Sequence, residues 1–199
     1  MRTILFDLGN VLVRYEHDVT MAALAALYGA DASAVRDAYA LVGLDFGLGQ
    51  LAAADVLERL NRRFGCNVDA GSFAQAFCAG LARDDGALAY VLSLQERQLT
   101  QVGAISNTNE LHVAWLDRHV PELAEFELVM MSNEVHCLKP DPEIFELALE
   151  LLDVPAAQVL YVDDLTVNVE AARALELAGI VHADWAATRP QIEAWLAAG

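Results

Sequence analysis

The fold prediction starts from residues 4–12, which have the sequence ILFDLGNVL. An apolar run ends at Asp7 and the chain turns at Gly9, so the run predicts a buried strand with a carboxylate at its tip. In an open α/β sheet, ligands bind beyond the carboxyl ends of the strands. Asp7 by itself also fits an ordinary loop residue, so its interpretation depends on partners further along the chain.

Three later segments carry polar residues, and two of them place these residues directly after an apolar, strand-like run. The segments are 102–109 (VGAISNTN), 138–142 (LKPDP) and 159–164 (VLYVDD), and the polar residues are Ser106, Asn107, Lys139, Asp163 and Asp164. Each has an ordinary explanation by itself, as a helix cap or, for Lys139, as a solvated loop residue. Together with Asp7 they follow the order Asp, Ser, Lys and Asp-Asp, which is far more specific than any one of them.

This ordered set resembles the four-motif pattern of the haloacid dehalogenase-like (HAD) hydrolase superfamily, and the resemblance covers nearly the whole chain. Residues 7–12 (DLGNVL) and 106–112 (SNTNELH) are also similar to a branch of small phosphatases that contains sugar-1-phosphate phosphatases. The resemblance implies a Rossmann-like parallel sheet with the strand order 5-4-1-2-3 and an inserted helical cap.

Apolar periodicity independently predicts an α/β fold. Strand-like runs lie at 3–7, 101–106, 126–131, 158–162 and 179–182. Helical patterns lie at 85–98, 109–119, 142–152, 166–178 and 189–197. Strands that alternate with helices indicate parallel βαβ units with right-handed crossovers.

Residues 16–82 interrupt this alternation. They contain helical patterns at 19–28, 32–41, 50–64 and 72–82, and we expect no strand among them. The sequence therefore predicts two domains, a core of residues 1–15 and 83–199 and a helical cap of residues 16–82. By resemblance, the cap lies over the active site, and its contacts select the substrate as it closes.

Composition limits the class of partner. The net charge of -17 over 199 residues argues against nucleic acid or anionic membranes as partners. We find no apolar stretch long enough to span a membrane and no signal peptide. Cys66, Cys78 and Cys137 are odd in number and lack metal-type spacing, so they predict reduced thiols and a cytoplasmic location. We expect a small-molecule phosphate ester as the binding partner and a monomer or homodimer.

A strongly acidic protein that binds phosphate needs local positive charge, and the resemblance supplies it as Mg²⁺. Asp7 would attack phosphorus, forming an aspartyl-phosphate, and would also bind the Mg²⁺ ion. The resemblance adds the Gly9 carbonyl and the Asp164 carboxylate as metal ligands. Asp163 would be a further ligand or would hold a metal-bound water.

The resemblance also assigns the phosphate-binding groups. Ser106 and the backbone amide of Asn107 would bind phosphate oxygens. Lys139 would bind both the phosphate and the Asp7 carboxylate, and this pairing is expected to keep Asp7 ionised at neutral pH. The expected catalytic residues are therefore Asp7, Ser106 and Lys139.

One position departs from the usual pattern. Most phosphatases of the superfamily carry a second aspartate two residues after the nucleophile, where it serves as general acid and base, but this chain has Gly9. General acid–base catalysis is typically worth ~10²–10⁴-fold in rate. The protein is therefore a slow phosphatase, a degenerate one, or one that recruits an acid from elsewhere. The candidate substitutes are His17, Asp18, Glu134 and His136.

The favoured activity is Mg²⁺-dependent hydrolysis of a small phosphomonoester, such as a sugar phosphate. A 2-haloacid dehalogenase would use the same aspartate against carbon, but it needs no metal, and the Asp163-Asp164 pair opposes it. A catalytically weak binding or regulatory member of the superfamily is a second alternative, which Gly9 permits. A receiver domain also has Asp and Lys on a parallel sheet, but the long insertion opposes that interpretation.

Overall fold

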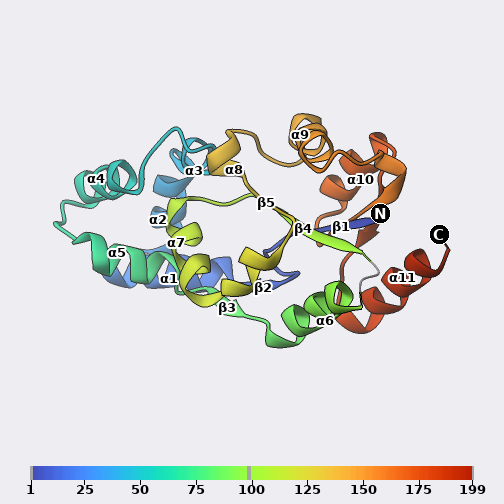
Figure 1. Cartoon of the computed structure of the whole chain (residues 1–199). Coiled ribbons are helices and arrows are strands. Elements are labelled where there is room, and N and C mark those ends of the chain that lie inside the picture. The colour runs from blue at the N-terminus through green and yellow to red at the C-terminus, as the bar shows by residue number, and fades with distance from the viewer. Residues whose placement is uncertain (1, 98–99, 199) are drawn as a thin grey trace.

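The computed structural model describes residues 2–97 and 100–198, and its central feature is a five-stranded parallel sheet (Figure 1). The strand order across the sheet is β5 (Leu128–Met131), β4 (Gln101–Ser106), β1 (Thr3–Phe6), β6 (Val159–Asp163) and β7 (Ala178–Val181). Counted in chain order among these five strands alone, the sheet is 5-4-1-2-3 from β7 to β5. The predicted α/β fold class is confirmed.

Helices cover both faces of the sheet because successive side chains of a strand point to opposite faces. On β1, Ile4 and Phe6 belong to one buried cluster, and Leu5 belongs to another. The first cluster is covered by α6 (Asp85–Glu96), α7 (Glu110–His119) and α11 (Trp185–Ala197). The second is covered by α9 (Pro142–Leu152) and α10 (Thr166–Ala174).

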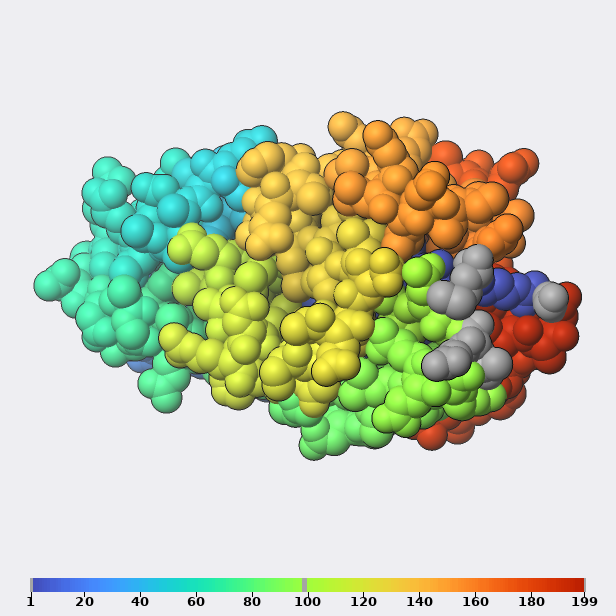
Figure 2. All heavy atoms as spheres, viewed as in Figure 1, coloured from blue at the N-terminus to red at the C-terminus, as the bar shows by residue number. Residues whose placement is uncertain are grey.

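A second group of helices follows β1 in the chain and lies at one end of the molecule (Figures 1 and 2). Its members are α1 (His17–Tyr28), α2 (Ala32–Ala40), α3 (Gly43–Gly47), α4 (Ala53–Phe64) and α5 (Ala70–Phe77). These helices share a core of their own, which includes Leu24, Phe46 and Phe73 and is separate from the two clusters of the sheet. We call them the helical body.

A small antiparallel sheet joins the helical body to the rest of the protein. It consists of β2 (Val13–Tyr15) and β3 (Leu81–Arg83), the segments by which the chain enters and leaves the body. The expectation of no strand within residues 16–82 is therefore wrong at Leu81 and Ala82. The expected helix at 72–82 ends at Phe77 because the chain at Gly80 crosses Glu16, whose amide donates to the Gly80 carbonyl at 2.9 Å.

The remaining elements are short. They are α8 (Ser132–Val135) and two 3₁₀ turns at Pro121–Glu125 and Ala156–Gln158. The C-terminal helix begins at Trp185, four residues before the expected start, because Asp184 caps it through the Ala187 amide. The predicted helix at 85–98 ends at Glu96, and residue 98 lies outside the described residues. None of the helices described at 2–97 and 100–198 has the length and apolar character needed to cross a membrane.

Candidate active site

A cavity of about 420 Å³ lies where the carboxyl ends of β1, β4 and β6 face the helical body. Asp7 follows β1 directly, Ser106 ends β4, and Asp164 follows β6. The opposite wall includes Tyr39 from α2 and residues from α3. The parallel sheet thus places three polar residues from distant parts of the sequence at one edge, as its topology requires.

Lys139 is the only lysine of the chain, and it is buried at the centre of the site. Its Nζ atom lies 2.7 Å from Asp7 Oδ1 and 2.9 Å from Asp163 Oδ2. The same ammonium donates to the Ile105 carbonyl at 2.9 Å. Because an ammonium has three donors, this geometry fixes the lysine between the two carboxylates.

Asp163 is fully buried, and both of its oxygens are engaged. Besides Lys139, it accepts hydrogen bonds from the Tyr161 hydroxyl, the Asn168 side chain and the Leu165 amide. Burial raises its pKa, but Lys139 and these hydrogen bonds outweigh burial, so the pKa lies below its usual value. Asp163 is therefore arranged to hold Lys139, and its oxygens are less open to a metal than those of Asp7 or Asp164.

The Asp7 carboxylate is buried at the rim of the cavity. Oδ1 accepts from the Leu8 amide at 2.7 Å as well as from Lys139. Burial raises the pKa of Asp7 to about 6, with Lys139 opposing that rise and Asp163 adding to it. The expected pairing with Lys139 is present, and burial is the larger influence on the pKa.

Three carboxylates and one ammonium leave surplus negative charge at this edge of the sheet. Oxygens of Asp7, Asp163 and Asp164 lie within 4.8 Å of one another. Asp164 is only partly buried, and burial raises its pKa. Carboxylate oxygens with surplus charge are suited to Mg²⁺, so the donor set fits the ion that the fold family implies.

Ser106 is buried at the end of β4, and Asn107 follows it with an exposed side chain. The Asn107 Nδ2 atom donates to the Lys139 carbonyl at 2.8 Å, and the Lys139 amide donates to Asn107 Oδ1 at 2.8 Å. Neither residue caps the following helix, because Asn109 accepts from the first amides of α7 instead. The two-bond clasp from Asn107 to the Lys139 backbone was not expected from the sequence.

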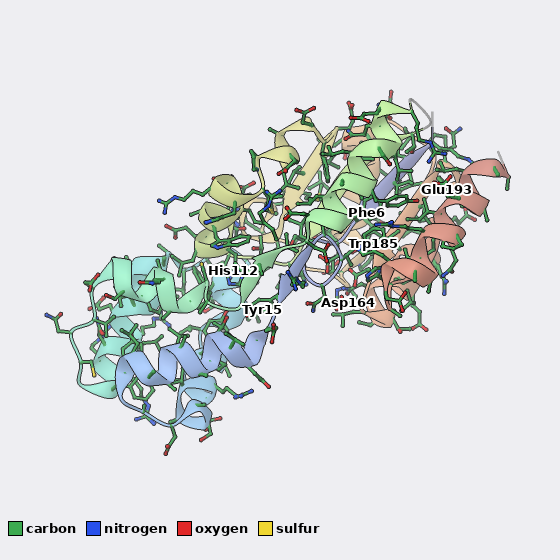
Figure 3. The ribbon with its side chains drawn as sticks, turned by 90° about the horizontal axis from the view of Figure 1, so that it is seen from below. Phe6, Tyr15, His112, Asp164, Trp185 and Glu193 are labelled. Atoms are coloured by element: carbon green, nitrogen blue, oxygen red, sulfur yellow. The ribbon has the colours of Figure 1, made fainter. Side chains whose placement is uncertain are left out.

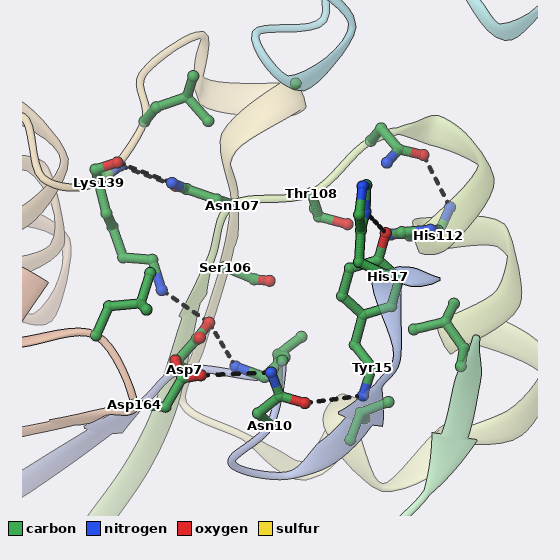
Figure 4. A pocket seen from close by; sticks show the side chains of 18 of the residues that line it. Asp7, Asn10, Tyr15, His17, Ser106, Asn107, Thr108, His112, Lys139 and Asp164 are labelled. Carbon is green, nitrogen blue, oxygen red and sulfur yellow. Dashed lines mark hydrogen bonds and ion pairs between the residues drawn. The ribbon is translucent and has the colours of Figure 1, made fainter. Parts of the chain in front are cut away.

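Of the four candidate substitutes for the general acid that Gly9 cannot provide, the structure places one in the cavity. His17 lines the cavity, with its Nδ1 atom 3.1 Å from the Tyr15 hydroxyl (Figure 4). Asp18 instead pairs with Arg36 at 2.9 Å on the surface. Glu134 and His136 do not line the cavity. The Nδ1 atom of His136 instead lies 2.8 Å from the Leu48 carbonyl oxygen. His112, on the first turn of α7, also lines the cavity.

A family model described as a haloacid dehalogenase-like hydrolase matches residues 1–176. The chain is 27% identical over 186 residues to D-ribitol-5-phosphate phosphatase from Bacteroides thetaiotaomicron, with 88% of each chain covered.

Solved structures show the same fold. A HAD family enzyme from Bacteroides thetaiotaomicron, in complex with magnesium and inorganic phosphate, has a TM-score of 0.85 at 22% identity, covering 94% of this chain and 98% of that chain. L-2-haloacid dehalogenase from Xanthobacter autotrophicus has a TM-score of 0.63 at 18% identity, covering 94% of this chain and 80% of the other. At these identities the likeness concerns the fold alone.

Proposed function

The chain belongs to the haloacid dehalogenase-like hydrolase family, and on that premise we propose that it hydrolyses a small phosphomonoester in the presence of Mg²⁺. The observation that carries the proposal is the buried Asp7–Lys139–Asp163 array beside the cavity. A carboxylate held beside an ammonium at a strand tip is suited to attack a phosphoryl group, because the ammonium can stabilise the negative charge of the phosphate oxygens.

In the proposed mechanism, a carboxylate oxygen of Asp7 attacks phosphorus. The phosphorus–oxygen bond to the alcohol breaks, and the electron pair leaves with the alcohol oxygen, so that an aspartyl-phosphate forms. Water then attacks this phosphorus, which releases inorganic phosphate and restores the carboxylate. Lys139 and Ser106, with the amide of Asn107, bind the phosphate oxygens during both steps.

Mg²⁺ held by Asp7, the Gly9 carbonyl and Asp164 would neutralise phosphate charge. We assign Asp163 to the positioning of Lys139, because its oxygens already accept from that lysine and from neighbouring groups. This assignment disfavours the alternative from the sequence analysis in which Asp163 is itself a metal ligand.

The substrate class is proposed from the relative and from the size of the cavity. The curated relative is named for a terminal phosphate on a pentitol, and a cavity of about 420 Å³ holds a molecule of that size. We therefore propose a small sugar or polyol phosphate. The Asp164 carboxylate close to Asp7 favours this activity over the dehalogenase alternative, which uses no metal.

We further propose that residues 16–82 act as the substrate-selecting cap on a core of residues 1–15 and 83–199. The separate core of the helical body supports this division, as does its contribution of Tyr39 and Gly43 to the cavity. We also propose a cytoplasmic location. All three cysteines are unpaired, as is usual in reducing compartments.

The test is a screen of sugar, polyol, nucleotide and amino-acid phosphates with Mg²⁺ and with EDTA. We expect phosphate release from small sugar or polyol phosphates only with the metal. Asp7→Asn should abolish turnover and keep the wild-type circular dichroism spectrum. Near wild-type turnover by Asp7→Asn, purified away from host phosphatases, would refute the covalent mechanism.

A further inference from the structure

The side chain of Asn107 holds the backbone of Lys139 by two hydrogen bonds, which we call the clasp. Its Nδ2 atom donates to the Lys139 carbonyl, and its Oδ1 atom accepts from the Lys139 amide, each at 2.8 Å. Figure 4 shows Lys139 with its backbone at Asn107 and its ammonium directed toward Asp7. The clasp lines the same cavity as Tyr15 and Asp164, which Figure 3 labels at the junction of the sheet and the helical body.

We infer that the Asn107 side chain is a positioning residue, which through the clasp places the Lys139 ammonium where it can bind both Asp7 and the phosphate. This inference rests on the proposed phosphatase function. It assigns a role to a side chain that the proposed mechanism leaves unused, since only the backbone amide of Asn107 takes part there.

The backbone of Lys139 depends on the clasp because of where it lies in the chain. Lys139 falls between the end of α8 at Val135 and the start of α9 at Pro142, so its amide and carbonyl take part in neither a helix nor a sheet ladder. Among residues 2–97 and 100–198, Asn107 is the only hydrogen-bond partner of both backbone groups. One side-chain amide, with one donor and one acceptor, satisfies both.

Strand β4 provides the rigid anchor for the clasp. Asn107 directly follows this strand, which pairs with β1 on one side and with β5 on the other. The Lys139 ammonium also donates to the carbonyl of Ile105 on the same strand, at 2.9 Å. The end of β4 therefore holds the lysine at its backbone and at its ammonium, and fixes it relative to Ser106, a second proposed phosphate-binding group.

The clasp matters most when Asp7 reacts. In the proposed mechanism, a carboxylate oxygen of Asp7 bonds to phosphorus, so the contact between Asp7 and the ammonium changes during the reaction. The clasp, the Ile105 carbonyl and Asp163 hold the lysine throughout. Because a misplacement of roughly 1 Å can cost about 100-fold in rate, loss of the clasp should slow the reaction even in a folded protein.

The experiment uses the fact that Lys139 is the only lysine of the chain. In protein labelled with ¹³C-lysine, the side-chain NMR signals therefore report on this residue alone. The Lys139 Nζ atom lies 5.7 Å from the centre of the Tyr161 ring and 2.7 Å from Asp7, so the signal is sensitive to its position. Asn107→Leu keeps the size and branching of the side chain but removes both bonds of the clasp. Because Asn107 is exposed, this variant should fold.

We expect Asn107→Leu to move the lysine signal toward its position in urea-unfolded protein, and to lower kcat/KM for phenyl phosphate in Mg²⁺ by about 10- to 100-fold. Asn107→Ala, which also removes both bonds, should do the same. The control is Asn61→Leu. The Asn61 side chain makes the same pair of bonds, at 3.0 Å each, to the backbone of Val68 in the helical body, and it does not line the cavity. Its loss should leave the lysine signal and kcat/KM unchanged.

A lysine signal that stays in place in both Asn107 variants would overturn the positioning role, even if turnover fell. An equal loss of kcat/KM in Asn61→Leu would also overturn it, because the clasp would then act only through overall stability. The proposed function fails separately if the wild type releases no phosphate from phenyl phosphate or from sugar and polyol phosphates. The lysine signal needs no turnover, so it still decides in that case whether Asn107 places Lys139.

Discussion

Replacement of Lys139 by methionine tests the central array of the site most directly. Methionine keeps an unbranched side chain, one heavy atom shorter, but lacks the ammonium that lies 2.7 Å from Asp7 and 2.9 Å from Asp163. Asp163 is 0% exposed, so water cannot replace its lost partner, whereas Asp7 is 8% exposed and lines the cavity. Removal of one partner from a buried ion pair typically costs about 3–5 kcal/mol of folding free energy.

The cost converts to an observable melting shift. For chains of this size, 1 kcal/mol corresponds to roughly 2–4 °C in Tm. We therefore expect Lys139→Met to melt about 6–20 °C below the wild type when both are measured in EDTA at pH 7.5. Arg118→Met is the control, because Arg118 is an exposed cation on α7. Its free energy of unfolding should change by less than about 0.5 kcal/mol.

A second substitution shows whether the loss arises from the stranded charge. In Lys139→Met/Asp163→Asn, the neutral amide no longer needs the ammonium. The double variant should therefore melt above Lys139→Met, with a coupling free energy of about 1–3 kcal/mol. A double variant whose Tm loss equals the sum of the two separate losses would refute the reasoning, as would a Lys139→Met protein as stable as the control.

Three other substitutions test the missing acid, the metal ligands and the buried histidine. Among the residues that the structure describes, a Cβ atom at Gly9 would meet only Asp7 Oδ2, at 3.9 Å, so Gly9→Asp should fold. It should reduce the dependence of kcat on leaving-group pKa across a series of aryl and alkyl phosphates. An equally flat dependence in the wild type would show that a general acid is already present. Asp164→Ala should raise the Mg²⁺ concentration needed for half-maximal activity at least tenfold, and full activity in EDTA would instead favour the dehalogenase alternative. Burial lowers the pKa of His112 to about 4 in the folded state, whereas the unfolded chain keeps a pKa near 6.5. The unfolded chain therefore binds more protons between these pH values, so the free energy of unfolding is highest above pH 6.5 and falls by about 3 kcal/mol as the pH drops to 4. Urea unfolding at pH 7.5 and 5.0 should therefore show a smaller pH dependence for His112→Phe than for the wild type, and equal dependences would contradict the assignment.

The sequence alone determined the sheet and the edge at which the site lies. Apolar runs such as Ile4-Leu5-Phe6 are typical of strands buried on both faces of a helix-covered parallel sheet, in which a polar residue after the run lies at the carboxyl edge. The order Asp7, Ser106, Lys139 and Asp163-Asp164 added the family resemblance. Apart from Lys139, which follows no strand, these features are local in the chain, since each depends on a run of a few residues and on the one or two residues directly after that run.

Only the tertiary structure decided how these residues are used. The antiparallel pairing of Val13 with Arg83 joins segments 70 positions apart, so the local periodicity around either strand carries no sign of the partner. The same holds for the side chain of Asn107, which clasps the backbone of Lys139 across 32 positions. The buried Nε2 atom of His112 is the clearest case. A histidine on the first turn of a helix is ordinary in sequence, and only the packing around its ring leaves Nε2 without a hydrogen-bond partner among residues 2–97 and 100–198.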